Sequence, residues 1–448
     1  MKIHNIYFNA RYKHTLVVPC LLLLFLLCAC IKSDIGLGLK IEPTIAKQYM
    51  ASTANPYATE AAIKILDKGG SAVDAAIAAQ MVLTLVEPQS SGIGGGGFLM
   101  YYDANSGNII AFDGRETAPA SANPEMFLNT DGDPRKWLDV VPGGLSVGVP
   151  GLLRMLEMAH KDYGYLSWKE LFQPAIKLSR NGFKVSKRLH NSSAIDLDLK
   201  IFTNSKNYFF DHTGKPHPIG SVLTNVQLAD TMERIATQGS DAFYNGPIAD
   251  DIVSTIQLAK KNPGGMLAKD LSDYKAIQRN PICMPYNEYL ICGMPPPSSG
   301  GITTLQILGI LQHLNIKTVN PGSLDSVHLF AEAGKLAFAD RNVYIADPDF
   351  FPPPFGMLGD KYLKLRASQI LSDDVIHNAQ PGMPGFGMGR LPMPDTTEKG
   401  VSTSHLSIID RHGNAVSMTS SIESRFGSRL MTRGFLLNNQ LTDFSFRP

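Results

Sequence analysis

Two hydroxyl side chains near the end of the chain, Thr403 and Ser421, are spaced so that they can lie side by side. Residues 403–410 alternate between apolar and polar side chains, as half-buried strands do, and residues 415–422 predict a second strand. The glycine-containing loop 411–413 joins them as a hairpin. Counting outward from this loop sets Thr403 opposite Ser421, close enough for the hydroxyls to hydrogen-bond. Such pairs are usually structural, so the spacing alone predicts only proximity.

A second candidate nucleophile is Ser146. It lies in the sequence GLSVG at 144–148, which fits the GxSxG motif of α/β-hydrolases. In that class the serine lies directly between a strand and a helix. Here Pro150 and Gly151 intervene before a helix begins. A serine hydrolase that acts through Ser146 is therefore kept as an alternative.

A glycine-rich stretch contains Gly92, Gly94 and Gly97 in the GxGxxG spacing of dinucleotide-binding loops. That function requires a strand before the glycines and a helix after them. Here a predicted helix precedes the glycines and a predicted strand follows. Nucleotide binding is therefore not expected, and close packing of the strand against the site explains the glycines better.

Cysteine usage limits metal and redox chemistry. Three of the five cysteines lie in the first thirty residues, so only Cys283 and Cys292 remain in the body of the chain. An oxidising compartment permits a disulfide between them, whereas the apolar, strand-like surroundings of Cys292 suit two buried thiols; both alternatives stay open. No CxxC pair, HExxH motif or Cys/His cluster occurs, so the sequence predicts no metal site.

The first thirty residues predict export. Arg11 and Lys13 precede an apolar run at 16–29, which is the pattern of a secretory signal peptide at 1–30. The run ends in LCAC at 27–30, which resembles a bacterial lipobox with Cys30 as the lipidated residue. Simple cleavage and an uncleaved anchor are the alternatives. All three alternatives place the body of the protein outside the cytoplasm, so the sequence predicts an exported protein that is either periplasmic or a membrane-anchored lipoprotein.

The body of the chain has the composition of a globular protein. Hydrophobic residues make up 44% and charged residues 18% of the sequence, and the net charge is +1. The absence of a basic stripe argues against nucleic acid as a partner. Helices are expected at 59–66, 71–85, 151–161, 167–181, 225–237, 247–259, 302–313 and 324–342. Strands are expected at 98–102 and 109–112, an irregular segment at 350–354 and a long mobile loop at 381–399. The mixture predicts one α+β domain.

Residues 403–416 resemble the segment that opens the small subunit of γ-glutamyltransferases, in which the first threonine is the nucleophile. Five further motifs resemble the same family in the same order: GGGGF at 94–98, DGRETAP at 113–119, GVPG at 148–151, MPPPSSGG at 294–301 and LNNQLTDF at 437–444. The resemblance covers about residue 46 to the end. It implies a four-layer αββα sandwich of the N-terminal-nucleophile hydrolases, with two stacked antiparallel sheets covered by helices. It implies no cofactor.

The resemblance also implies the chemistry. Self-cleavage between Ser402 and Thr403 would separate a large subunit, 31–402, from a small one that begins at 403 and joins the same domain. The α-amine of Thr403 would then act as the general base for its own hydroxyl. The enzyme would form an ester with the γ-glutamyl group of a donor such as glutathione. It would pass that group to water, an amino acid or a peptide, with Ser421 orienting the nucleophile.

Substrate-binding residues follow from matching positions. Arg115 matches the arginine that binds the α-carboxylate of the glutamyl group, and Asp443 and Gln440 match the positions that bind its α-ammonium. Glu423 departs from the family, which commonly has asparagine there. A carboxylate would favour the ammonium and repel the α-carboxylate, so a glutaryl-type acylase of the same superfamily is an alternative.

The family's small subunit extends well beyond the equivalent of residue 448. The further part normally supplies a pair of serines for the α-carboxylate and two backbone N–H groups of the oxyanion hole. The sequence at 403–448 is therefore interpreted as the start of a small subunit. An inactive exported protein is a further alternative, and it predicts one uncut polypeptide.

Overall fold

The computed structural model of the protein describes residues 44–314, 316–385 and 402–447. The chain divides into two compact units, Met1–Lys47 and Gln48–Pro448, and the account below concerns the second unit. The predicted signal at 1–30, with Cys30, and most of the predicted loop at 381–399 lie outside the described residues. Export and lipidation therefore stay predictions. Within the described ranges, no helix is long and apolar enough to cross a lipid bilayer.

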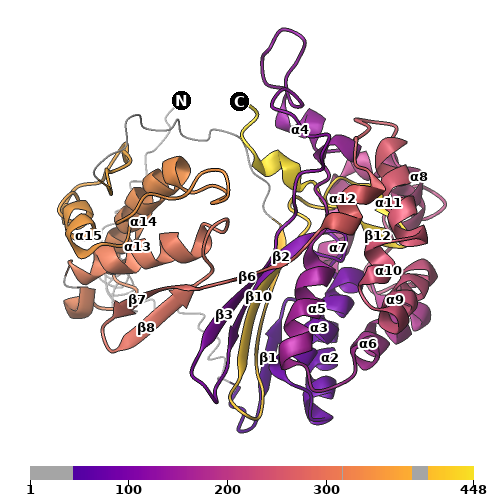
Figure 1. The fold of residues 1–448 in the computed structure, drawn as a ribbon, viewed down its shortest axis with the longest axis horizontal. Helices are drawn as coiled ribbons and strands as arrows, with labels where there is room; N and C mark the ends of the chain where they lie inside the picture. Colours follow the sequence, from indigo (N-terminus) through magenta and orange to yellow (C-terminus); the bar gives the residue numbers. More distant parts are fainter. Residues whose placement is uncertain (1–43, 315, 386–401, 448) are drawn as a thin grey trace, which may run out of the picture. The chain divides into compact units, whose positions relative to one another are not determined.

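A six-stranded antiparallel sheet forms the centre of this unit (Figure 1). Its two central hairpins are made from segments that are about 300 residues apart in the chain. In spatial order the strands are β1 (Met50–Thr53), β9 (Thr403–Ile409), β10 (Ala415–Ser421), β2 (Gly96–Tyr102), β3 (Ile109–Gly114) and β6 (Ile277–Arg279).

One face of this sheet is buried under helices. Along β9, Ser404, Leu406 and Ile408 are buried, whereas the alternate residues from Thr403 onward are exposed. Helix α3 packs on β9 and β10, and every one of its residues is buried. Beside α3 (Ala72–Val86), the helices α2 (Pro56–Asp67) and α5 (Leu152–Tyr163) also contact the sheet, and α6 (Trp168–Asn181) packs on α3. The period of two thus turns alternate residues of β9 to the opposite face of the sheet.

Further short elements extend the same hydrophobic core. The helices are α7 (Lys187–Ile195), α8 (Thr203–Phe209), α9 (Val226–Gln238), α10 (Asp241–Tyr244), α11 (Pro247–Gln257) and α12 (Ala268–Asp273). Helix α4 (Trp137–Val140) belongs to a separate small cluster with Phe127, Leu441 and Phe446. Two small hairpins pair β4 (Phe183–Lys184) with β5 (Val222–Leu223) and β11 (Met431–Thr432) with β12 (Phe435–Leu436). Single 3-10 turns lie at Gly144–Ser146, Leu197–Lys200, Ile316–Thr318 and Gln440–Asp443.

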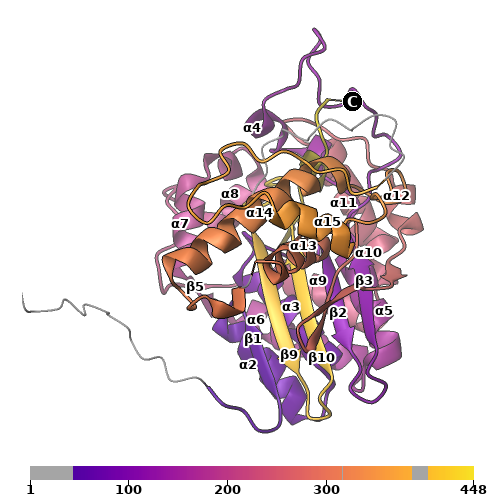
Figure 2. The same cartoon turned by 90° about the vertical axis from the view of Figure 1, so that its left-hand side faces the viewer.

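A second group of helices lies on the open side of the sheet (Figures 1 and 2). It contains α13 (Gly300–Gln312), α14 (Leu324–Tyr344) and α15 (Asp360–Ala367), with a core of its own and a hairpin of β7 (Ile282–Tyr286) and β8 (Tyr289–Gly293). Cys283 and Cys292 are directly opposite in this hairpin and form a disulfide. The structure therefore decides between the two alternatives that the sequence left open.

The expected α+β class is confirmed, as are the expected helices and strands that fall on described residues. Residues 350–354 are irregular, as predicted. Among the described residues, every sheet other than the central one has two strands. The described residues therefore form helices on both sides of one large sheet, without a second large sheet stacked on it.

The glycine run that leads into β2 packs against other backbone segments at very short range. A Cβ atom on Gly95 would lie 2.1 Å from the carbonyl oxygen of Ser421, and one on Gly94 would lie 2.1 Å from that of Leu436. Helix α3 precedes the run and β2 follows it. This is the reverse of a dinucleotide loop, and the packing explanation given for these glycines is confirmed.

Replacing Gly95 by alanine is expected to destabilise the protein by about 1–3 kcal/mol, because the new methyl group overlaps the end of β10. The matched control is Gly334→Ala in α14, where an added Cβ meets no atom within 4 Å. That change should be neutral or stabilise by up to about 1 kcal/mol, as alanine favours a helix. Denaturant unfolding measures both, and a Gly95→Ala variant as stable as the control would contradict the packing argument.

Candidate active site

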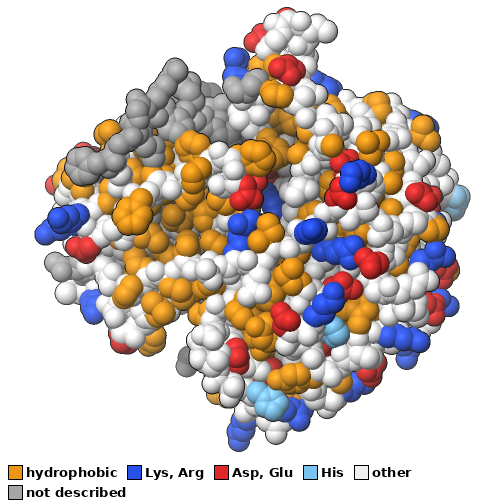
Figure 3. All heavy atoms as spheres, in the orientation of Figure 1, with side chains coloured by type: hydrophobic (Ala, Val, Ile, Leu, Met, Phe, Trp, Pro, Cys, Tyr) orange, Lys and Arg blue, Asp and Glu red, His pale blue; other side chains and the backbone are white. Residues whose placement is uncertain are grey.

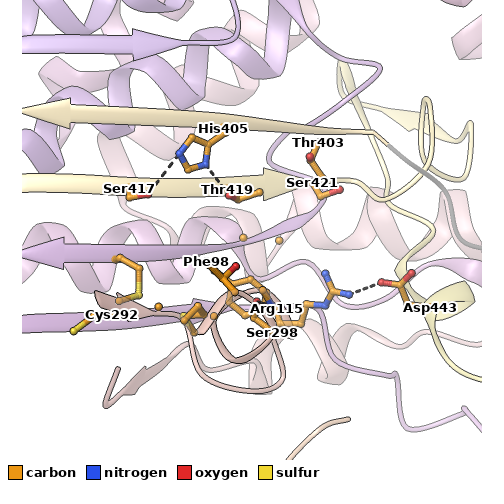
Figure 4. Close-up of a pocket in the computed structure, with 18 of the residues that line it drawn as sticks. Phe98, Arg115, Cys292, Ser298, Thr403, His405, Ser417, Thr419, Ser421 and Asp443 are labelled. Atoms are coloured by element: carbon orange, nitrogen blue, oxygen red, sulfur yellow. Dashed lines mark hydrogen bonds and ion pairs between the residues drawn. The ribbon is translucent and has the colours of Figure 1, made fainter. Parts of the chain in front are cut away.

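Thr403 is the first residue of β9 and Ser421 is the last residue of β10. The two residues are directly opposite in the antiparallel register, as predicted from the length of the loop (Figure 4). The N–H of Asp410 donates to the carbonyl oxygen of Asn414 at 3.0 Å, and Gly413 adopts a left-handed φ of 84° in the turn. Both hydroxyl side chains therefore project from the face of the sheet that α3 does not cover.

The side chain of Asp410 fixes this register. One carboxylate oxygen accepts the N–H groups of His412 and Asn414 at 2.9 and 3.1 Å. The other accepts the Asn414 amide at 3.0 Å and the N–H of Ala72, in the first turn of α3, at 3.1 Å. Asp410 is 1% exposed. The turn is thus closed by its own side chain and attached to a helix N-terminus, where a negative charge is favoured.

Ser421 contacts the peptide bond that precedes Thr403. Its hydroxyl donates to the carbonyl oxygen of Ser402 at 3.1 Å and accepts the N–H of Glu423 at 2.8 Å. The backbone donor occupies the hydroxyl oxygen, so the hydroxyl proton is directed at the Ser402 carbonyl. This is the carbonyl that Thr403 would have to attack in self-cleavage.

His405, two residues after Thr403, lies on the same face of β9 (Figure 4). Its Nδ1 is 2.8 Å from the hydroxyl of Thr419, and its Nε2 is 3.2 Å from that of Ser407. Burial lowers the pKa of its ring, which favours the neutral form at neutral pH. The ring therefore links β9 to β10 next to the hydroxyl pair.

Thr403, His405, Thr419 and Ser421 line a cavity of about 700 Å³ between the open face of the sheet and the α13 region. In Figure 3 the surface is hollowed on this side, and apolar side chains gather there. All six catalytic and substrate-binding residues predicted from the sequence line the cavity, and they are Thr403, Ser421, Arg115, Glu423, Gln440 and Asp443. The cleavage residue Ser402 lies next to it and is 9% exposed. The structure thus brings the predicted residues together, from segments far apart in sequence.

Charged groups of both signs lie at one end of this cavity. Arg115 forms an ion pair with Asp443, and the Gln440 amide donates to the same carboxylate oxygen. Both partners of the ion pair are about one third exposed, at 33% and 28%. Glu423 is 5% exposed and accepts a hydrogen bond from the side-chain amide of Asn439. Among the described residues, the lining of this cavity therefore contains one arginine side chain, Arg115, and two acidic ones, Asp443 and Glu423.

Glu116 is a feature of the site to which the sequence analysis assigned no role, although the residue lies in the motif at 113–119. Its carboxyl group occupies the space of a side chain at position 96, whose partner in the sheet is Ser421. Neither carboxyl oxygen has a hydrogen-bond partner among the described residues. Burial raises the pKa of Glu116 to about 7, although the positive charge of Arg115 partly opposes this.

Ser146, the alternative nucleophile, is not placed for catalysis. It is fully buried at the end of a 3-10 turn that follows a short helix rather than a strand. Its hydroxyl donates to the carbonyl oxygen of Val141 at 2.7 Å, and that of Gly143 lies at 3.1 Å. The α/β-hydrolase alternative was therefore wrong, because Ser146 closes a buried turn. Within the described part of the chain, no group of three or more metal-ligating side chains is found either.

Solved structures of known proteins are similar to this fold. The chain is 27% identical to cephalosporin acylase from Bacillus halodurans, with a TM-score of 0.76 over 91% of this chain and 73% of that one. It is 34% identical to the γ-glutamyltranspeptidase of Helicobacter pylori, with a TM-score of 0.73 over 78% of this chain and 99% of that one. These neighbours define the fold class, that of the N-terminal-nucleophile hydrolases.

The sequence comparisons narrow the class to a family. The family described as Gamma-glutamyltranspeptidase matches residues 58–448. The glutathione hydrolase proenzyme of Bacillus subtilis (strain 168) is 38% identical over 413 residues, which are 90% of this chain and 70% of that protein. The chain therefore belongs to the γ-glutamyltranspeptidase family.

The raised pKa of Glu116 predicts a pH dependence of stability. The folded protein holds this proton up to about pH 7, whereas an unfolded glutamate loses it near 4.5, so the stabilisation is complete below about 4.5 and is lost as the pH approaches 7. Because glutamine does not titrate, the variant Glu116→Gln should not lose this stabilisation as the pH rises. The free energy of unfolding of the variant minus that of the wild type should therefore increase between about pH 4.5 and 7 and level off above that range.

Denaturant titrations at several pH values measure this difference. Glu125→Gln, at an exposed position, is the control and should follow the wild type at every pH. A Glu116→Gln difference that stays constant with pH would contradict the assignment.

Proposed function

We propose that this chain is the precursor of an enzyme that cleaves itself after Ser402 and then transfers or hydrolyses γ-glutamyl groups, with glutathione as a donor. Thr403 is the nucleophile of both reactions. The observation that carries the proposal is the hydrogen bond from Ser421 to the carbonyl oxygen of Ser402, directly opposite Thr403.

Self-cleavage uses groups that are already adjacent. The Thr403 hydroxyl oxygen attacks the Ser402 carbonyl carbon, and negative charge develops on the oxygen that Ser421 contacts. The bond from that carbon to the Thr403 nitrogen breaks, which leaves an ester and a free amine. Water then opens the ester. The products are a carboxylate on Ser402 and a Thr403 that carries both a hydroxyl and an α-amine.

Turnover repeats this attack on a donor. The α-amine takes the proton of the Thr403 hydroxyl while the oxygen attacks the γ-carbonyl of the glutamyl amide. The amine of the donor leaves with a proton, and the γ-glutamyl group stays on Thr403 as an ester. Water or an amino acid then attacks the ester and regenerates the hydroxyl.

The charged end of the cavity supports a γ-glutamyl group as the transferred unit. Its head carries an α-carboxylate and an α-ammonium, which can replace the Arg115–Asp443 ion pair charge for charge. Glu423 adds a second acidic group near the ammonium. A glutaryl group carries only the negative charge. It could replace Asp443 as the partner of Arg115, but it would supply no cation to the Asp443 carboxylate. The charges therefore favour the transferase over the acylase alternative.

Thr403→Ala is expected to leave one intact polypeptide, whereas the wild type yields two fragments, the smaller beginning at Thr403. Ser421→Ala should slow cleavage by roughly 100-fold, since it removes a donor to the developing oxyanion. Intact mass and N-terminal sequencing of purified protein measure both. Ser407→Ala, on the same face of β9 but outside the cavity, is the control and should cleave like the wild type. An intact wild-type chain would support the inactive alternative.

The mature enzyme should prefer a γ-glutamyl anilide to the matching glutaryl anilide by roughly 10- to 100-fold in kcat/KM, the value of a hydrogen bond to a charged group. Asp443→Asn should narrow this preference because it removes one partner of the ammonium. Steady-state kinetics with both anilides measure the ratio. Equal rates on both substrates would instead favour the acylase alternative.

A further inference from the structure

A chain of hydrogen bonds connects Ser402 to a buried carboxylate behind the sheet. Ser402 Oγ lies 3.2 Å from Ser90 Oγ, and the guanidinium of Arg188 donates to Ser90 at 2.8 Å. Arg188 also pairs with Glu87 at 3.0 Å. The Glu87 side chain is only 4% exposed and accepts a further bond from Asn55 at 2.8 Å. The residue before Thr403 is thus attached by its side chain to the loop that follows α3.

The chemistry of the groups sets the direction of each bond. Arg188 can only donate, so it occupies the oxygen of Ser90 and leaves the Ser90 proton for another acceptor. Ser402 donates its own proton to the carbonyl oxygen of Gln89 at 2.8 Å. The Ser90 proton must therefore point to Ser402. The bonds run in one direction from Arg188 through Ser90 and Ser402 to Gln89, and bonds in such a series strengthen one another.

Gln89 and Ser90 also bind the backbone that follows β10. The Ser90 carbonyl oxygen accepts the N–H of Ile422 at 3.3 Å, and that of Gln89 accepts the N–H of Phe426 at 3.2 Å. Ile422 directly follows Ser421. The segment 89–90 therefore binds Ser402, whose carbonyl would be attacked in self-cleavage. It also binds the backbone next to Ser421, which donates a hydrogen bond to that carbonyl.

We propose that Ser90, held by Arg188, is a positioning residue for self-cleavage. It fixes the Ser402 side chain so that the Ser402 carbonyl stays within reach of both Ser421 and the Thr403 hydroxyl. This inference rests on the proposed self-cleavage and extends it to groups that never touch the reacting atoms. Attack on a carbonyl requires the reacting atoms in near-contact geometry, so a residue free to rotate at 402 is slower to react.

Ser90→Ala is the test, with the precursor made in a cell-free system and its cleavage followed by gel after translation is stopped. Cleavage is expected to be about 5- to 10-fold slower, as for the loss of one hydrogen bond. Ser91→Ala is the matched control, because Ser91 is the next residue, is fully buried, and has an Oγ with no hydrogen-bond partner among the described residues. It should cleave at the wild-type rate. Ser90→Thr keeps the hydroxyl and should restore most of the rate.

A double-mutant cycle separates positioning from loss of stability. If Ser90 acts through Ser402, adding Ser90→Ala to Ser402→Ala should slow cleavage no further. If the two substitutions slow cleavage by factors that multiply, or if the Ser90→Ala precursor cleaves at the wild-type rate, Ser90 does not position Ser402. Either result would leave the proposed self-cleavage untouched. A wild-type precursor that never cleaves would overturn self-cleavage itself, and this role with it.

Discussion

The antiparallel pairing of β9 with β10 is the constraint on which the site depends. A slip of one residue would turn Thr403 toward α3 and bury it with Leu406 and Ile408. Asp410 prevents this at the far end of the hairpin, where it closes the turn and binds the first turn of α3. A structural carboxylate seven residues from Thr403 thus determines which face of the sheet Thr403 occupies.

The other end of the hairpin is held by close packing and by polar groups. Gly95 brings its backbone against the carbonyl of Ser421, where no larger residue fits. The segment 89–90 binds the backbone after Ser421 and the side chain of Ser402. The Ser402 side chain and the backbone after Ser421 are therefore held by the same short loop, which connects the buried helix α3 to the central strand β2.

The charged groups of the site are held by each other rather than by the pairing of strands. Arg115 and Asp443 are partly exposed and paired with each other, so a ligand with both charges can exchange with them. Glu116 lies deeper, and its burial favours the neutral carboxyl. The cavity thus has a partly exposed charged end beside the hydroxyls of Thr403 and Ser421, which are held by backbone pairing.

Sequence reasoning predicted the features that are set by local patterns. The alternation of β9 and β10 and the length of their loop were enough to place Thr403 opposite Ser421. Helix α3 begins at the expected place, where Ser71 and Asp74 form a capping box. Helix α7 was missed because its sequence, KRLHNSSAI, has few apolar residues at helical spacing. The disulfide was left open because the spacing of two cysteines does not reveal a shared hairpin.

Local sequence patterns could not predict contacts between segments that are far apart in the chain. Ser90 and Ser402 are 312 residues apart, and nothing in either neighbourhood specifies the other. The Arg115–Asp443 pair spans 328 residues, and only the resemblance to the family placed both residues in one site. The buried carboxyl of Glu116 depends on glycine at position 96, across the sheet from it.

Trapping of the acyl-enzyme tests the central claim most directly. The mature protein is mixed with a γ-glutamyl donor, quenched in acid within one turnover, digested and analysed by mass spectrometry. The account predicts a mass increase of one γ-glutamyl residue on the peptide that begins at Thr403, sensitive to alkali as an ester is. A γ-glutamyl group on any other residue, or turnover with no labelled peptide, would contradict it.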